Sequence, residues 1–590
     1  MWFKGLKIKV DYFMVWESIK HFPHHCKSQK VIAEGDFLVG FIAVFAFLLL
    51  FLENFAYLKP YSYIVGEINL AISLIFIFDV LLRFFASSSK KEYIRHNWFD
   101  LIVFVPFIQL AQAIDNTPFF VISRQLAIIA MFLSRGRKTA KLINLLRLKP
   151  AQLMILTFGL AIGAGTILLM LPAATKSGIR TSLTDAFFTA TSATCVTGLI
   201  VKDTAAYFSV FGQTVILALI QIGGLGIMTF SVSLALLQGR RMDLKQEAIM
   251  SDVLDQSSLT NVKNLVIYIL RMTFIFELCG AIMLFLTWAA KFGATIETAY
   301  HSFFHSVSAF CNAGFSTFPD NLMSFRDDIP TNLVVSGLII VGGMGFIVVK
   351  DLQENFRNRL RFSVKRKTQL KVQTKIVIWT SLTLIVLGAA AIYFFEKGAL
   401  FSGLNIKSKI LASFFQSVTA RTAGFNSCDI AGLSGASLLV IMALMFIGGS
   451  PGSTAGGIKT TTFSVLGAAL ISEFRGKENV EMFRRTIPIE VIRKTVVIFF
   501  ASTMLVALFA LALLFVEKKM FSSILFETFS AFGTVGLSTG VTGSLSAKGK
   551  LIIAALMFIG RLGPLTVGYA FLKYRAKPKY EYASESVATG

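Results

Sequence analysis

Four short segments of the chain share a glycine-containing pattern that could form a binding site for a cation. The segments read FFTATSATCVTGLI, FFHSVSAFCNAGFS, FFQSVTARTAGFNS and LFETFSAFGTVGLS, and the shared glycines are Gly198, Gly314, Gly424 and Gly536. Backbone carbonyls from four turns can point at one axis and replace the hydration shell of an ion. Glycine permits the backbone angles that such a turn requires, so the pattern predicts a cation filter.

The four glycines recur at intervals of 116, 110 and 112 residues, which indicates an internal repeat. A glycine that only caps a short helix would explain one segment, whereas four segments in register favour a filter. The predicted filter residues are each glycine and the two residues before it: Val196, Thr197 and Gly198; Asn312, Ala313 and Gly314; Thr422, Ala423 and Gly424; Thr534, Val535 and Gly536.

A second, weaker repeat follows each segment and contains an unusual arginine. The motifs are IGGLG (222–226), VGGMG (341–345), IGGSPG (447–452) and IGRLG (559–563), and they align Arg561 with Gly224, Gly343 and Gly449. A membrane-embedded arginine costs about 3 kcal/mol on insertion scales and is a functional-site hypothesis by default. We expect Arg561 to face the axis below the filter, where its positive charge would impede cations. The alternative is a snorkelling or ion-paired structural arginine.

The stretch 448–459 holds five glycines, a proline and three hydroxyl residues within an otherwise apolar run. A helix cannot continue through such a stretch cheaply, and non-helical backbone at membrane depth is tolerated where it lines a cavity. A phosphate-binding loop is excluded because Ile458 separates Gly457 from Lys459. The stretch therefore predicts a flexible intramembrane gate, whose residues besides Arg561 are Gly448, Gly449, Gly452, Gly456, Gly457 and Lys459.

The elements that must position these residues are membrane spans. Of 590 residues, 55% are hydrophobic and only 15% are charged, and the mean hydropathy is +0.69. These values exclude a typical water-soluble enzyme and a disordered or collagen-like chain. Twelve apolar runs are long enough to span a membrane. They lie near 36–57, 62–86, 99–115, 117–134, 152–172, 207–237, 263–290, 331–349, 375–395, 436–471, 494–516 and 549–572.

The basic residues predict the orientation of the chain. Lys and Arg outnumber Asp and Glu by 57 to 33, and in the twelve-span arrangement the basic clusters share one side, which must be the cytoplasm. We therefore expect a multi-pass protein of the cytoplasmic (inner) membrane with both termini in the cytoplasm, and no nucleic acid is needed to explain the charge. The clusters are residues 4–30, 90–95, 135–149, 240–245, 350–375, 475–494 and 573–579.

Each repeat reads as a span, a re-entrant loop and a second span, so two crossings return the chain to its starting side. The four units are then parallel and can surround one axis. The predicted fold is an all-α polytopic membrane protein with four parallel M1–P–M2 pore repeats around one pore, preceded by four extra transmembrane helices. The expected parts are a cytoplasmic N-terminus (1–35), the four-helix extension (36–150), pore repeats at 151–238, 262–350, 374–472 and 493–575, and a cytoplasmic tail (576–590).

The four-helix extension allows two interpretations. It resembles the voltage-sensor domain of ion channels, because Arg135, Lys138 and Lys141 follow its fourth span at the three-residue step of a gating helix. That span itself carries no charge between Arg124 and Arg135. The plainer interpretation is a packing domain with cytoplasmic anchors, and the sequence leaves open whether the domain senses voltage.

Catalytic chemistry finds little support in the sequence. The six histidines include no HExxH motif, and His301 and His305, one helical turn apart, lack an apparent third metal ligand. The five cysteines show no metal-ligand spacing. A membrane-embedded enzyme would need a clustered acid–base or metal site, so we do not expect an enzyme.

The loop sequences CVTGL, CNAGFS, RTAGFN and GTVGLSTG resemble those of the Trk/Ktr/HKT superfamily of potassium transporters. The segment GGSPGSTAGGIKTTT (448–462) is similar to the interrupted second helix of that family's third repeat. The resemblance covers roughly residues 150–575. It implies a bacterial Trk/Ktr-type pore subunit that takes up potassium, its transported substrate, under the membrane potential. In the family, a glycine in all four loops goes with potassium selectivity.

The resemblance also implies partners. A homodimer in the lipid bilayer would dock on a cytosolic ring subunit that binds a nucleotide (ATP, ADP or NAD), while the chain itself would hold no covalent cofactor. The basic 350–375 loop is the candidate docking surface. The alternative function is a voltage-gated, or a sodium-permeable or sodium-coupled, cation channel.

Overall fold

The computed structural model describes residues 150–226, 262–360 and 369–571, together with a few isolated positions between 77 and 90. The chain divides into two compact units, Met1–Arg147 and Leu148–Gly590, and the helices below belong to the second unit. The four-helix extension therefore lies almost entirely outside the described residues. The N-terminal 35 residues and the 576–590 tail lie outside them as well.

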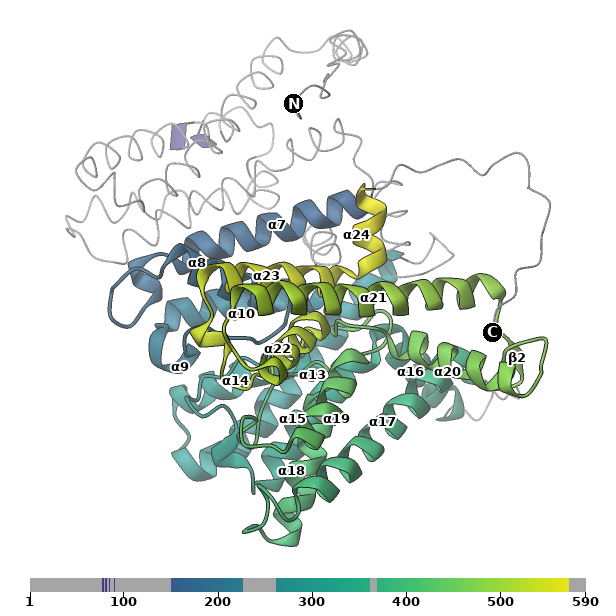
Figure 1. The fold of residues 1–590 in the computed structure, drawn as a ribbon. Coiled ribbons are helices and arrows are strands. Elements are labelled where there is room, and N and C mark those ends of the chain that lie inside the picture. Colours follow the sequence, from purple (N-terminus) through teal and green to yellow (C-terminus); the bar gives the residue numbers. More distant parts are fainter. Residues whose placement is uncertain are drawn as a thin grey trace, which may run out of the picture. The chain divides into compact units, whose positions relative to one another are not determined.

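The first two repeats each consist of helices joined by loops (Figure 1). Repeat 1 consists of α7 (Pro150–Leu169), α8 (Leu183–Thr194), α9 (Thr204–Tyr207) and α10 (Val210–Leu225). Repeat 2 consists of α13 (Val262–Phe292), α14 (Ile296–Phe310), α15 (Ile329–Met344) and α16 (Phe346–Leu360). Single 3-10 turns at Pro172–Ala174 and Met323–Phe325 lie in the connections between these helices.

The last two repeats follow the same order of elements. Repeat 3 consists of α17 (Val372–Glu396), α18 (Ile406–Thr419), α19 (Gly435–Phe446) and α20 (Thr460–Phe474). A small antiparallel hairpin, β1 (Glu481–Met482) and β2 (Arg485–Thr486), leads into repeat 4. Repeat 4 consists of α21 (Ile489–Val516), α22 (Phe521–Gly533), a 3-10 turn at Thr542–Ser544, α23 (Ala547–Leu562) and α24 (Pro564–Phe571).

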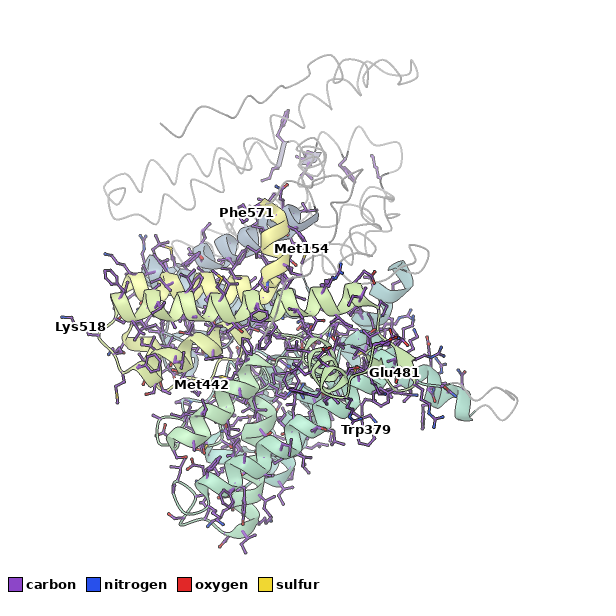
Figure 2. The ribbon with its side chains drawn as sticks, turned by 45° about the vertical axis from the view of Figure 1, so that its right-hand side comes forward. Met154, Trp379, Met442, Glu481, Lys518 and Phe571 are labelled. Atoms are coloured by element: carbon purple, nitrogen blue, oxygen red, sulfur yellow. The ribbon has the colours of Figure 1, made fainter. Side chains whose placement is uncertain are left out.

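The first helix of each repeat is a membrane span. Four helices in the described ranges are long and apolar enough to cross a membrane: Ala151–Leu169, Val266–Phe292, Val372–Glu396 and Ile489–Val516. On α21, large apolar side chains at i, i+4 and i+3 steps stay exposed on one face, which suits contact with lipid. They are Phe500, Met504, Leu508, Leu511 and Phe515. Figure 2 shows Lys518 and Glu481, two charged residues of the flanking segments, at opposite ends of α21.

In repeats 2 and 4 the second helix is bent sharply rather than straight. The prediction of 331–349 and 549–572 as single spans did not include these bends. The helix pairs α15–α16 and α23–α24 bend by 100° and 94°, and the second bend is visible in Figure 1. The last glycine of the motif lies at each bend, and Gly345 and Gly563 have φ of 90° and 87°. Gly226, which ends α10, has a φ of 78° as well. This left-handed conformation ends a helix and favours glycine.

The repeats close into a ring. The short helix that precedes each glycine loop is here called the pore helix; the pore helices are α8, α14, α18 and α22. The second helix of each repeat packs on the pore helix of the next repeat: α10 on α14, α15 on α18 and α19 on α22. The cycle closes because α23 of repeat 4 packs on α8 of repeat 1. The outer helices also meet, because Gln152 of α7 donates to the Ala570 carbonyl of α24 at 3.0 Å. Figure 2 shows Met154 and Phe571 near this junction. Four pseudo-equivalent units therefore surround one axis.

The pore helices lie in the core of the ring. The second residue of each bulky pair, Phe188, Phe304, Phe415 and Phe526, is completely buried. Glycines let the first helices approach these pore helices closely, and Gly280 and Gly388 pack on Ser306 and Ser417. This buried wall fixes where each pore helix ends, and hence where the following loop begins.

Candidate functional site: four glycine loops and an intramembrane loop

Each pore helix is followed by a loop that turns back on the helix's last turn. Backbone hydrogen bonds hold the predicted filter residues there. Thr197 N donates to Ser192 O at 2.8 Å, and Ala313 N donates to Ser308 O at 2.7 Å. The same bond joins Ala423 N to Thr419 O at 3.0 Å and Val535 N to Ser530 O at 2.9 Å. The four loops therefore share one local geometry.

The shared geometry includes two left-handed residues in every loop. The first is not glycine: Val196, Asn312, Thr422 and Thr534 have φ of 56°, 60°, 74° and 50°. The second is the shared glycine, with φ of 93°, 69°, 78° and 97° at Gly198, Gly314, Gly424 and Gly536. A β-branched residue such as Val196 at positive φ is strained, and such strain persists where the surrounding structure imposes it, often at functional sites.

The four glycines make a closed cycle of contacts with one another's loops. A Cβ on Gly198 would clash with the Ala313 carbonyl of repeat 2, and one on Gly314 would clash with the Ala423 carbonyl of repeat 3. A Cβ on Gly424 would meet the Val535 carbonyl, and one on Gly536 would meet the Thr197 carbonyl of repeat 1. The structure thus brings all twelve predicted filter residues together, and each glycine allows the carbonyl of the next repeat to approach.

Hydroxyl groups of the pore helices support this ring. Ser192 Oγ accepts from Gly198 N and Ser530 Oγ accepts from Gly536 N, each at 3.1 Å. The side-chain hydroxyls of Thr197 and Thr534 have no hydrogen-bond partner within the described parts of the chain. Potassium and sodium prefer oxygen ligands, so the donor set of carbonyls and hydroxyls suits an alkali cation as the transported substrate.

The 448–459 segment forms a compact non-helical loop between α19 and α20, here called the intramembrane loop. Its two ends are tied together, because Gly448 N donates to Ile458 O at 2.8 Å and Thr460 N donates to Gly449 O at 3.0 Å. Inside the loop, Lys459 Nζ donates to the Ala455 carbonyl at 2.7 Å. The loop is therefore a defined turn with its charged end group satisfied internally.

The intramembrane loop contacts the neighbouring repeats at their glycine motifs. Ser450 N donates to the Gly343 carbonyl and Phe346 N donates to the Gly452 carbonyl, each at 3.0 Å. On its other side, a Cβ on Gly456 would clash with the side chain of Thr534, in the filter loop of repeat 4. The loop therefore lies between the broken second helix of repeat 2 and the filter loop of repeat 4.

Arg561 joins the intramembrane loop to two other repeats. Its guanidinium donates to the Thr454 carbonyl of the loop and to the Gly223 carbonyl of α10. Within the described residues Arg561 has no acidic partner. The arginine of repeat 4 thus occupies the position of the repeat glycines Gly224 and Gly343, and it is held by main-chain oxygens. A guanidinium satisfied only by carbonyls keeps its full positive charge.

Sequence reasoning did not single out Arg421, a second buried arginine. Arg421 lies one residue before the filter triplet of repeat 3, and its side chain is 9% exposed. It donates to Ser381 Oγ of α17 at 3.2 Å and to the Gly448 carbonyl at 3.4 Å. The other repeats have Cys195, Cys311 and Gly533 at this position. The comparison that identified Arg561 could therefore have found Arg421 too.

A buried polar cluster behind the filter was also not predicted. Glu277 of α13 is 5% exposed and accepts from Gln221 Nε2 of α10 at 3.2 Å and from Cys311 Sγ at 3.7 Å. The cluster connects the first helix of repeat 2 to the second helix of repeat 1. No pattern in the sequence marks it, because each of its members comes from a different apolar segment.

At the outer ends of the pore helices, polar side chains fix the loops that follow the filter. His301 and His305 of α14 contact the hydroxyls of Thr317 and Ser316, in the loop that follows the filter, at 2.6 and 2.9 Å. Glu527 accepts from Ser538 Oγ at 2.6 Å. In the described part of the chain no group of three His, Cys, Asp or Glu side chains could hold a metal ion.

One ion pair closes the ring at this end. Lys550 of α23 contacts Asp185 of α8 at 2.6 Å, and the two side chains are only 14% and 11% exposed. Asp185 lies in the first turn of its helix, where a carboxylate is favoured by the helix dipole. The pair joins repeat 4 to repeat 1, which the sequence places 365 residues apart.

Comparison with known proteins assigns the family. The family model described as "Cation transport protein" (TrkH) matches residues 120–582. The Ktr system potassium uptake protein B of Bacillus subtilis is 41% identical over 453 residues, which cover 76% of this chain and 99% of the relative. The protein of the same name from Vibrio alginolyticus is 38% identical, over 74% of this chain and 94% of the relative.

Two further comparisons agree with this family. The potassium/sodium uptake protein NtpJ of Enterococcus hirae is 37% identical, over 75% of this chain and 98% of the relative. The crystal structure of the potassium transporter TrkH from Vibrio parahaemolyticus matches the fold with a TM-score of 0.61 at 17% identity, over 82% of this chain and 99% of that chain. These proteins are transporters, not enzymes. The chain is therefore a multi-pass membrane protein that belongs to the TrkH family of cation transport proteins.

Proposed function

We propose that the chain takes up potassium through the ring of four glycine loops. The observation that carries this proposal is the closed cycle in which Gly198, Gly314, Gly424 and Gly536 each admit a carbonyl of the next repeat. A ring of carbonyls can replace the hydration shell of potassium, and it binds a cation without any charged ligand. The membrane potential would drive entry, at about 2.3 kcal/mol per charge for each 100 mV.

The proposed gate consists of Arg561 and the intramembrane loop. The loop packs on Thr534 of the filter and is held by Arg561 through the Thr454 carbonyl. A fixed positive charge at this level would repel a cation that has just left the filter. Opening then requires the Thr454 contact to break, so that the loop and the guanidinium can move apart.

The proposed regulator is a cytosolic ring subunit that binds a nucleotide, with two copies of this chain docked on it. Residues 350–360 of the basic 350–375 segment form most of α16, which carries Lys350 and Arg357. We place α16 on the cytoplasmic side with the other basic clusters. The bent pair α15–α16 connects this side to Gly343, which binds the intramembrane loop. A pull on α16 could therefore reach the gate. We place the chain in the cytoplasmic membrane with both termini in the cytoplasm.

One alternative to selective potassium uptake is a transporter that also carries sodium or is coupled to it. A relative that is 37% identical is named a potassium/sodium uptake protein, and sodium permeability or coupling would need only a looser filter. The presence of glycine in all four loops favours potassium alone. The alternative of a voltage-gated channel depends on the four-helix extension, which lies almost entirely outside the described residues. The ring of four glycine loops gives this alternative no support.

Growth of a bacterial strain that lacks its own potassium uptake systems tests the proposal. Expression of this chain with the ring subunit from the same source should restore growth at low potassium. Co-purification of the two proteins should yield a complex that contains two copies of this chain. Unrestored growth despite normal amounts of protein in the membrane would contradict potassium uptake, and loss of the ring subunit without any change in growth would contradict the proposed regulator.

A further inference from the structure

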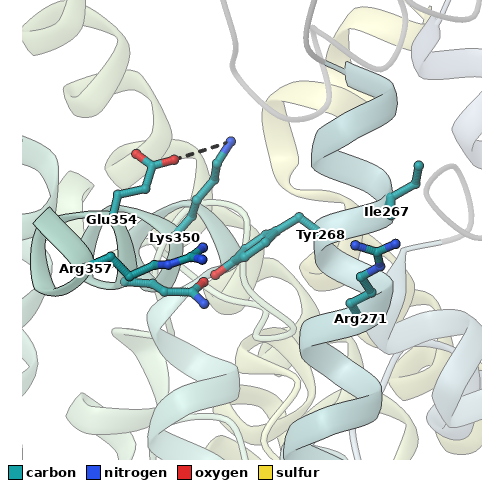
Figure 3. A pocket seen from close by; sticks show the side chains of 7 residues that line it. Ile267, Tyr268, Arg271, Lys350, Glu354 and Arg357 are labelled. Atoms are coloured by element: carbon teal, nitrogen blue, oxygen red, sulfur yellow. Dashed lines mark ion pairs between the residues drawn. The ribbon is translucent and has the colours of Figure 1, made fainter. Parts of the chain in front are cut away.

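A pocket of about 450 Å³ lies between the N-terminal part of α13 and α16, and none of its lining residues belongs to the filter loops. Figure 3 shows Tyr268 of α13 and Arg357 of α16 pointing toward each other across it. The pocket forms because α16 leaves α15 at 100° and so runs across the side of α13 rather than parallel to it. Its lining residues in the described ranges are Ile267, Tyr268, Arg271, Lys350, Gln353, Glu354 and Arg357.

The pocket carries an excess of positive charge. Lys350 is paired with Glu354 at 3.9 Å and lies 5.9 Å from the centre of the Tyr268 ring. Arg271 and Arg357 are exposed, and neither forms an ion pair with any residue of the described ranges. Two free guanidinium groups on facing helices can each donate two parallel hydrogen bonds to a phosphate, which is the geometry that favours arginine over lysine.

The position of Arg271 indicates what kind of phosphate would bind. Arg271 lies within the apolar span Val266–Phe292, where an unpaired charge is costly. The same helix face continues with exposed apolar side chains at i+3, i+4, i+7 and i+11, so it is a continuous stripe. These are Phe274, Ile275, Leu278 and Ile282, which are 65%, 56%, 43% and 51% exposed. A ligand with a phosphate at one end and a hydrocarbon chain beyond it matches this face.

We propose that the pocket binds the headgroup of an anionic phospholipid from the leaflet on the basic side. The phosphate would accept hydrogen bonds from Arg271 and Arg357, and Tyr268 and Gln353 would donate to the remaining headgroup oxygens. The acyl chains would lie along the Phe274 stripe. Basic pockets between transmembrane helices on the cytoplasmic side are suited to such headgroups. The bound lipid would connect α13 to α16, the helix that leads to Gly343 and the intramembrane loop.

Binding of short-chain lipids to the purified full-length protein in detergent tests this site. The melting temperature is followed while dioctanoyl phosphatidylglycerol, dioctanoyl phosphatidylcholine or inorganic phosphate is added. We expect phosphatidylglycerol alone to raise the melting temperature of the parent. The double variant Arg271→Gln/Arg357→Gln should need about thirtyfold more phosphatidylglycerol, since each lost charge contributes about 1 kcal/mol.

Two further variants control for charge and folding. Arg475→Gln/Arg485→Gln removes two exposed arginines from the region between α20 and α21 on the same side, and it should respond to phosphatidylglycerol like the parent. Arg271→Lys/Arg357→Lys keeps the charge and should retain most of the response. Native mass spectrometry should find bound phosphatidylglycerol on the parent and on these two controls.

Several results would overturn the proposal. An equal response of the parent and of Arg271→Gln/Arg357→Gln would show that the lipid acts elsewhere. A rise in melting temperature with inorganic phosphate that matches the rise with phosphatidylglycerol would assign the pocket to a soluble phosphate compound instead. A parent that responds to none of the three additives would exclude the site, and so would an equal response to phosphatidylcholine.

Discussion

The guanidinium of Arg561 in α23 donates a hydrogen bond to the main-chain carbonyl of Thr454 in the intramembrane loop. Thr454 in turn donates from its own amide to the Gly342 carbonyl at 3.4 Å, and Arg561 also contacts the Gly223 carbonyl. One residue pair therefore connects all four repeats at the level of their glycine motifs. The proposed gate, if built on this pair, would respond to movement of any one second helix.

Replacement of Arg561 by glutamine should raise potassium flux in the absence of the proposed ring subunit. The change removes the positive charge and weakens the bond that holds the intramembrane loop at Thr454. Flux is measured with monodisperse protein in liposomes. Arg475→Gln, which removes an exposed arginine after α20, serves as the control and should leave flux unchanged. Flux of Arg561→Gln no higher than that of the parent would count against a barrier role.

Replacement of Gly198 by serine should admit sodium more readily. Gly198 has a φ of 93°, and a Cβ there would clash with the carbonyl of Ala313, so the carbonyl ring must widen or tilt. The permeability ratio of potassium to sodium is measured for Gly198→Ser and for Gly163→Ser, a glycine of α7 whose added Cβ would meet no atom of the described residues. The ratio should fall in the first variant only, and an unchanged ratio in Gly198→Ser would refute the filter assignment.

Replacement of Arg421 by methionine should raise the melting temperature and alter flux. Arg421 is buried, and no carboxylate in the described ranges pairs with it, so its charge is a cost that methionine avoids. The substitution also breaks the bond from Arg421 to the Gly448 carbonyl, which links the filter loop of repeat 3 to the intramembrane loop. A lower melting temperature would mean that the arginine stabilises the fold rather than serving the proposed gate.

Replacement of Asp185 by asparagine should destabilise the closed ring by about 1–3 kcal/mol, because Lys550 then keeps a poorly solvated charge without a partner. A double-mutant cycle with Lys550→Met isolates the contact of the pair. The free energy of unfolding is followed in detergent for the parent, both single variants and the double variant. The double variant should recover much of the loss, and purely additive effects would contradict a direct interaction.

Much of this arrangement follows from patterns that repeat within the chain. The four loop segments recur with their glycines at similar intervals, and the structure brings Val196, Asn312, Thr422 and Thr534 to the same left-handed conformation. A repeat reveals equivalent positions, and an outlier such as Arg561 then stands out. Sequence patterns were sufficient here because equivalent positions of the repeats have the same backbone conformation even where the residue type differs, as at Val196 and Asn312.

Other features depend on contacts between segments that no repeat connects. The breaks at Gly345 and Gly563 were not predicted, because an apolar run reads as one span whether it is straight or bent by about 100°. The cluster of Glu277 with Gln221 joins two helices whose approach only the folded ring determines. The lining of the pocket at Arg271 likewise depends on the direction in which α16 leaves its glycine. Such tertiary geometry cannot be obtained from periodicity alone.

The most direct test of the central claim is the flux of potassium and of sodium into liposomes that contain the purified protein together with the proposed ring subunit. With equal concentrations of the two ions outside and an imposed inside-negative potential, the closed cycle from Gly198 to Gly536 predicts potassium flux well above sodium flux. Equal fluxes of the two ions through monodisperse protein would contradict selection by the four glycine loops.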